Sequence, residues 1–189
     1  MRNATKTQFE VWAQFRVSKR SMVEIHNFFK QEYAISPEFL VPNLHVTIYH
    51  SRRPMPKLEE MEKSCHFSID TLDTRFMVLA PGGENPRPHL IPGRRKVGIR
   101  IKRTSNFRKI IHEYRCLFLP HETEKVLGSR KPSSSSRNAF GARSFQPHIS
   151  ILKGGSGIIS NLSEVGENFR EIVHEIYFDR FLIRKRRNF

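Results

Sequence analysis

Two short stretches of similar sequence, Leu44-His45-Val46-Thr47-Ile48-Tyr49 and Pro147-His148-Ile149-Ser150-Ile151-Leu152, decide the fold of this chain. Both are rich in β-branched residues and alternate between polar and apolar side chains, which predicts strands over 44–49 and 147–152. Because residues i and i+2 of a strand share a face, each strand should present an imidazole beside a hydroxyl. The residues predicted on these polar faces are His45, Thr47 and Tyr49 in the first stretch and His148 and Ser150 in the second.

Further strands and helices are expected on both sides of these stretches. Apolar spacing predicts a helix that begins at the capping-box sequence Ser21-Met22-Val23-Glu24 and reaches about residue 33. The most amphipathic stretch runs from Phe107 to Phe118 and should end before Pro120. The other expected elements are strands at 9–17, 67–70, 75–79, 97–102, 172–178 and 180–184, a short polar helix within 54–63, and a short helix at 161–171.

This order of elements repeats weakly along the chain. In each half a strand, a helix and a loop precede the histidine strand, and the separation from His45 to Phe76 nearly equals that from His148 to Phe181. Two similar β-α-β-β units would pack about a pseudo-twofold axis, with equivalent strands facing one another. We therefore predict an α+β fold: a single bilobal domain over 1–189, with interdependent halves of about 1–90 and 91–189 and two antiparallel-rich sheets around a central cleft.

The composition favours a polyanionic partner. Of the 189 residues 38% are hydrophobic and 27% are charged, which is enough apolar content for one well-buried domain. Lysine and arginine number 33 against 18 acidic residues, so the formal net charge is +15. No acidic residue lies between Glu84 and Glu113, or between Glu124 and Glu164. This excess favours nucleic acid, a nucleotide or a phosphorylated molecule as the ligand.

The sequence disfavours several classes of protein. Cys65 and Cys116 are too few for a disulfide framework or a cysteine-rich zinc site. Two histidines without a carboxylate at ligand spacing make a poor metal site, so we expect neither a metal nor another cofactor. The N-terminus lacks the apolar core of a signal peptide, and no apolar run is long enough to span a membrane. These features favour a cytoplasmic protein without membrane insertion.

The pattern His-x-Ser/Thr is weak evidence by itself, because nine histidines would give about one match by chance. His121 also matches, but it follows Pro120 in a charged stretch without a predicted strand. His66 matches as well and could lie on a strand, which makes it a competitor. His45 and His148 differ from both by their equivalent places in the two halves. The alternative is that they are ordinary histidines with hydrogen-bonded hydroxyl neighbours.

The paired motifs on duplicated halves resemble the 2H phosphoesterase superfamily. It includes the bacterial and archaeal 2′-5′ RNA ligases, RNA 2′,3′-cyclic phosphodiesterases and some enzymes that degrade cyclic oligonucleotides. The resemblance runs from the strand near Phe9 to the strand that ends near Arg184, and it departs from the family in 81–96 and 128–146. It implies that His45 and His148 are catalytic and that the two hydroxyls, those of Thr47 and Ser150, bind the scissile phosphate.

Elementary chemistry agrees with that implication. In-line cleavage of a phosphodiester needs a base for the nucleophile and an acid for the leaving oxygen, on opposite sides of phosphorus. One neutral and one protonated histidine can do this without a metal, while two hydroxyls donate to the nonbridging oxygens. Expected substrates are RNA ends with a 2′,3′-cyclic phosphate, or small cyclic or 2′-5′-linked nucleotides. With a 5′-hydroxyl end the reverse reaction would join RNA. Which histidine is the base stays open.

Other candidate residues carry less weight. Tyr49 shares the predicted polar face and would line the cleft, unless it fills the core. Phe140 and Phe145 precede the second motif, where a ring could stack on a base, and Arg143 could hold a phosphate. A different class of function also remains: a basic RNA-binding module that keeps the fold without catalysis.

Overall fold

The α+β class is confirmed by the structure, a computed structural model that describes residues 11–51, 57–79, 96–102, 105–115, 147–154 and 161–185. The strands are β1 (Val11–Val17), β2 (His45–Ser51), β3 (Met61–Asp70), β4 (Thr74–Leu79), β5 (Lys96–Ile101), β6 (His148–Leu152) and β7 (Glu175–Lys185). The α-helices are α1 (Lys19–Glu32), α2 (Ser105–Arg115) and α4 (Leu162–Ile172), and the 3-10 helices are η1 (Pro37–Phe39) and η2 (Thr71–Asp73). No helix of these ranges is both long and apolar enough to cross a membrane.

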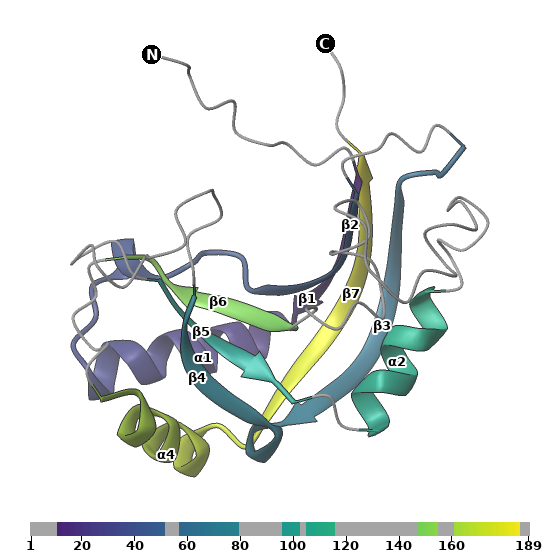
Figure 1. Cartoon of the computed structure of the whole chain (residues 1–189). Coiled ribbons are helices and arrows are strands. Elements are labelled where there is room, and N and C mark those ends of the chain that lie inside the picture. The colour runs from purple at the N-terminus through teal and green to yellow at the C-terminus, as the bar shows by residue number, and fades with distance from the viewer. Residues whose placement is uncertain are drawn as a thin grey trace, which may run out of the picture.

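The strands form one seven-stranded sheet in the order β3-β7-β1-β2-β6-β5-β4, and each described pair is antiparallel. The prediction of two sheets is therefore wrong. The reason is that the two histidine strands pair with each other: Val46 of β2 lies opposite Ile149 of β6. Figure 1 shows the result as one strongly curved sheet, with β3 at one end and β4 towards the other.

The two halves of the chain exchange strands. β4 belongs to the first half but pairs with β5 of the second, and β7 belongs to the second half but pairs with β1 of the first. Each of these two strands therefore lies two places from the β2–β6 pair. The ranges 1–90 and 91–189 are thus interleaved in one sheet.

The three α-helices in the described ranges pack on the same face of the sheet. Cross-strand pairing places six side chains in one row on that face: Phe76, Ile99, Ile149, Val46, Phe15 and Phe181. Phe29 of α1 and Phe169 of α4 contact Phe76, with ring centroids 5.8 and 5.2 Å apart. Tyr114 of α2 contacts Phe15 at 4.8 Å. In Figure 1 these helices lie along the outer side of the curved sheet.

Helix α1 begins three residues earlier than the sequence predicts. Ser18 is its N-cap, because the Ser18 Oγ accepts a hydrogen bond from the Ser21 N–H at 3.2 Å. Ser21 is instead buried inside the helix, where its Oγ accepts a hydrogen bond from the Tyr177 N–H of β7 at 3.0 Å. The serine that resembled a cap therefore attaches α1 to the sheet.

Two further expectations are corrected by β7. The strands predicted at 172–178 and 180–184 are one continuous strand, because β7 is hydrogen-bonded to β1 on one side and to β3 on the other. The helix predicted within 54–63 is also wrong for the described residues, since 57–60 are not helical and β3 begins at Met61. Residues from Met61 onward form a strand because they pair with β7, although this polar stretch has weak strand propensity of its own.

Gly98 generates a stability prediction, because β5 approaches β6 too closely at this point for a side chain. An added Cβ would lie 2.4 Å from the carbonyl oxygen of Ile149. We expect Gly98→Ala to lower the free energy of unfolding by about 1–3 kcal/mol, measured by urea denaturation.

The matched control is Gly166→Ala in α4, where an added Cβ would make ordinary contacts of 3.5 Å. Alanine favours a helix interior, so this variant should gain about 1 kcal/mol. Equal effects of the two substitutions would contradict the close approach at Gly98.

Candidate active site

The β2–β6 pair brings the two sequence motifs together. With Val46 opposite Ile149, the antiparallel register places His45 opposite Ser150 and Thr47 opposite His148. Residues directly opposite each other have Cβ atoms about 5 Å apart, and diagonal neighbours lie about 7–8 Å apart. His45 and His148 are diagonal neighbours in this arrangement, so one phosphate-sized group can lie between their rings.

The four motif side chains lie on the face of the sheet opposite the one that the described α-helices cover. Val46 and Ile149 belong to the helix-covered row and are fully buried, so their sequence neighbours point to the opposite side. His45, Thr47 and Ser150 are half-buried there, and His148 is exposed. We call this side of the sheet, which carries His45, Thr47, His148 and Ser150, the polar face.

Two arginines flank the histidines on the polar face. Arg16 of β1 lies opposite His45, and Arg100 of β5 lies opposite His148. Sequence reasoning missed Arg16 and did not connect Arg100 with the site, because neither is near a motif along the chain. The alternating pattern of β1 and β5 does predict that Arg16 and Arg100 lie on the polar side of their strands. Only the pairing register shows that they lie opposite His45 and His148.

Matching irregularities follow the two motifs. The β1–β2 register shifts after Thr47, and the β5–β6 register shifts after Ser150. A bulge inverts the alternation of faces beyond it. Tyr49 consequently lies opposite Ala13, is 2% exposed and packs in the hydrophobic core. The structure therefore places Tyr49 in the core rather than on the polar face that simple alternation predicted.

A carbonyl oxygen fixes the tautomer of His45. The His45 Nδ1 lies 2.9 Å from the Asn43 carbonyl oxygen, which can only accept, so Nδ1 carries the proton and Nε2 has the lone pair in the neutral ring. Burial lowers the pKa of His45 below its ordinary value of 6.5, and the charges of Arg16 and His148 lower it further, against the opposing effect of the Asn43 hydrogen bond. At neutral pH His45 is therefore a neutral imidazole able to accept a proton.

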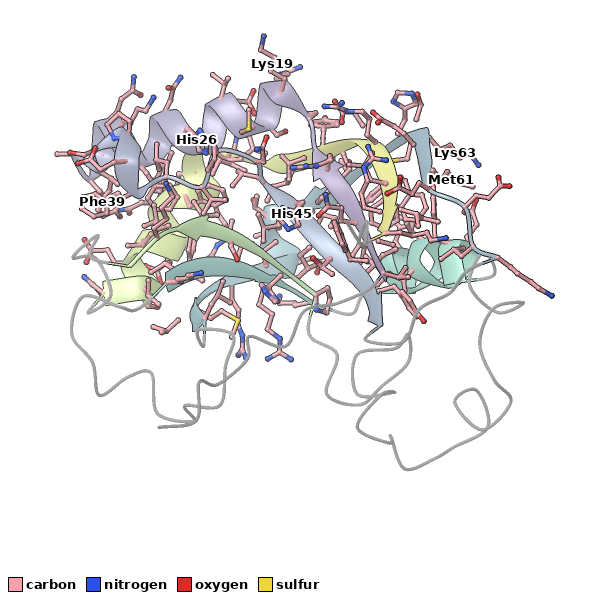
Figure 2. The ribbon with its side chains drawn as sticks, turned by 90° about the horizontal axis from the view of Figure 1, so that it is seen from above. Lys19, His26, Phe39, His45, Met61 and Lys63 are labelled. Atoms are coloured by element: carbon pink, nitrogen blue, oxygen red, sulfur yellow. The ribbon has the colours of Figure 1, made fainter. Side chains whose placement is uncertain are left out.

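The surroundings of the two histidines differ. Figure 2 shows His45 on β2 near the middle of the sheet, and its ring is half-buried. His148 is exposed to water at the corresponding place on β6, beside Arg100. The same tripeptide pattern thus provides one imidazole held by the backbone and one in contact with solvent.

The remaining predicted residues do not join this cluster in the described structure. His66 is exposed on β3, three strands from β2. Phe140, Arg143, Phe145 and His121 lie outside the described residues. Over the ranges that the structure describes, no group of three or more His, Cys, Asp or Glu side chains could hold a metal ion.

Comparison with known proteins does not assign a family. A scan against protein-family models finds no match, and a search of curated proteins finds none either.

The electrostatics of His45 yield a prediction that is independent of any activity. Removing a neighbouring positive charge stabilises the protonated ring, so Arg16→Gln should raise the pKa of His45. Nitrogen-15 NMR titration measures that pKa and also reports the tautomer of the neutral ring, which should carry its proton on Nδ1.

His26 of α1 is the internal control. Burial lowers its pKa as well, but Arg16 does not contribute to that shift. Its titration should therefore not move in the Arg16→Gln variant. An unchanged His45 pKa, or a neutral ring protonated at Nε2, would contradict the geometry described above.

Proposed function

We propose that the protein is a metal-independent phosphodiesterase that cleaves nucleotide phosphodiesters with two histidines. The observation that carries this proposal is the β2–β6 register, which places His45 and His148 diagonally with a hydroxyl opposite each. Four groups with complementary proton-transfer and hydrogen-bonding roles then surround one small space. The resemblance to the 2H phosphoesterases supports the same conclusion from the residues of the motifs.

His45 is the general base in this proposal. Its Nε2 accepts a proton from the attacking water, while the Asn43 carbonyl holds Nδ1–H and so fixes the ring orientation. His148 is the general acid and donates its proton to the leaving ribose oxygen. With a 2′,3′-cyclic phosphate, one P–O bond forms to water and one ring P–O bond breaks, which leaves a phosphomonoester beside a free hydroxyl.

Hydroxyls and guanidinium groups stabilise the charge that develops on the phosphoryl oxygens. Thr47 and Ser150 lie beside the histidines and can donate to the nonbridging oxygens. Arg16 and Arg100 lie one strand further out on either side, where each adds a positive charge. Placing fixed donors and cations at the site avoids the cost of reorganising solvent during the reaction.

The substrate class is a nucleotide with a strained or accessible phosphodiester: an RNA end with a 2′,3′-cyclic phosphate, a 2′-5′ linkage or a cyclic oligonucleotide. The net charge of +15 supports a polyanionic ligand. Attack by a 5′-hydroxyl in the reverse direction would join RNA ends with the same two proton transfers.

A basic RNA-binding module without catalysis is the second candidate. The observation that favours it is the charge of the polar face, where Arg16, Arg100 and Arg180 occur on three different strands. Such a protein would bind oligonucleotides with strong salt dependence and would not turn them over.

Substituting each histidine separately tests the proposal. His45→Gln and His148→Gln should each lower turnover of an oligonucleotide ending in 2′,3′-cyclic phosphate by about 10²–10⁴-fold, with EDTA present throughout. Product phosphomonoester is measured, and cyclic dinucleotides and 2′-5′-linked dinucleotides complete the substrate panel.

The matched control is His66→Gln, because His66 also precedes a serine by two residues but lies on the edge strand β3. It should retain activity within about twofold, as expected of a residue outside the site. Equal residual activity in all three variants, or loss of wild-type activity on chelation, would exclude the two-histidine mechanism. Binding without turnover in the wild type would favour the RNA-binding module.

The pH profile tests the assignment of His45 as the base. A base must be neutral, so kcat/KM should fall on the acid side as His45 gains a proton, with its inflection below 6.5. Arg16→Gln should move that acid-side inflection to higher pH, because it raises the pKa of His45. An inflection that does not move would assign the acid limb to another group.

A further inference from the structure

A pocket of about 390 Å³ opens on the polar face beside His45. Its wall includes Asn43, whose carbonyl holds the His45 ring, and Arg16, which lies opposite His45. The other charged wall residues are Lys19, Glu62, Arg180 and Arg184. Four cations and one carboxylate therefore line a space next to the candidate active site.

One glutamate organises two of these arginines. Glu62 of β3 accepts a hydrogen bond from the Arg184 Nη2 at 3.0 Å and lies 3.4 Å from the Arg180 Nη1. The hydrogen bond from Arg184 lowers the pKa of the Glu62 carboxyl, with a smaller contribution from Arg180, so Glu62 is ionised at neutral pH. A guanidinium carries five N–H donors, and both arginines therefore keep donors for a ligand.

The three guanidinium groups of the pocket repel one another. Arg16 lies directly opposite Arg180, and burial together with the charges of Arg180 and Arg184 lowers the pKa of Arg16. Glu62 offsets only part of this repulsion. An anion bound among the arginines would relieve the remainder, and phosphate suits the planar, bidentate donor geometry of arginine.

This pocket does not overlap the place of the scissile phosphate. That phosphate would lie between His45 and His148, over the β2–β6 pair. Arg180 lies on β7, two strands from β2, which is about 10 Å at the usual spacing of strands. Arg180 and Arg184 therefore serve a different group of the ligand, while Arg16, opposite both His45 and Arg180, lies between the two positions.

We propose that the pocket lined by Arg16, Arg180 and Arg184 binds a second phosphate, the internucleotide phosphate next to the one cleaved. The inference rests on the proposed function for the position of the cleaved phosphate. It specifies the substrate class: an oligonucleotide of at least two nucleotides, in preference to a single nucleoside cyclic phosphate.

The test compares two stable ligands that differ in one nonbridging group of the internucleotide linkage, and therefore in one negative charge. The dinucleotide ApA with a 3′-phosphate is titrated calorimetrically into the full chain, beside the same molecule with an uncharged methylphosphonate linkage. The charged linkage should bind about tenfold more tightly, as a charge-assisted hydrogen bond predicts. It should also make the dependence of log K on log salt steeper by about 0.7 for the additional phosphate that the protein neutralises.

Arg180→Gln should reduce this advantage of the charged linkage to about threefold or less. Lys19→Gln, on the α1 side of the pocket, is a second variant that should also reduce the advantage of the charged linkage. The matched control is Arg75→Gln, because Arg75 is also exposed and lies two strands from the β2–β6 pair, but on β4 and outside the pocket. This control should keep the full advantage.

Equal affinity of the wild type for the two ligands would overturn the inference. If Arg180→Gln and Arg75→Gln reduced the advantage of the charged linkage equally, the inference would also be overturned, because the effect would then come from the overall positive charge of the polar face. Neither ligand contains a 2′,3′-cyclic phosphate, a 2′-5′ linkage or a cyclic oligonucleotide, so their binding is measured apart from the proposed reaction. An advantage that depends on Arg180 in a protein without phosphodiesterase activity would support the second phosphate site and reject the proposed reaction.

Discussion

The candidate site depends on one backbone pairing, that of Val46 with Ile149. Both side chains are fully buried, and this pair joins two groups of strands into a single sheet. Because strand faces alternate, burying these two residues towards the helices forces the residues on either side of them onto the polar face. A slip of one residue between β2 and β6 would turn one of the two histidines into the core, so the hydrophobic contacts of Val46 and Ile149 also fix the position of the chemical groups.

Similar motifs acquire different chemistry from their surroundings. His45 and His148 each begin a strand, precede a hydroxyl by two residues and lie opposite an arginine. Only His45 combines a half-buried position with an Nδ1 held by the Asn43 carbonyl, and burial there disfavours the protonated ring. Lowering the pKa of His45 favours its neutral form at neutral pH, which is the form that a general base needs.

Sequence patterns predicted the positions of strands and helices, which depend on neighbouring residues. Alternation located the strands around both histidines, and apolar spacing located α1 and α2, because these signals come from neighbouring residues. The failures involve long-range pairing. Tyr49 was assigned to the wrong face because a bulge against β1 reverses the alternation, and Ser21 resembled a helix cap although it bonds to Tyr177 of β7. Arg16 could not be associated with His45, since only the β1–β2 register makes them neighbours.

The extra strand β3 explains why a pocket forms beside His45. On that side of the β2–β6 pair the described sheet has β1, β7 and β3, whereas the other side has β5 and β4. Arg180 and Arg75 occupy corresponding places, two strands from the pair, and among the strands that the structure describes only β3 lies beyond either of them, next to the strand of Arg180. That strand contributes Glu62, which holds Arg180 and Arg184 at one wall of the pocket. The arrangement around the two histidines is therefore asymmetric, with organised arginines on the β3 side, and this asymmetry is the basis for proposing a second phosphate site there.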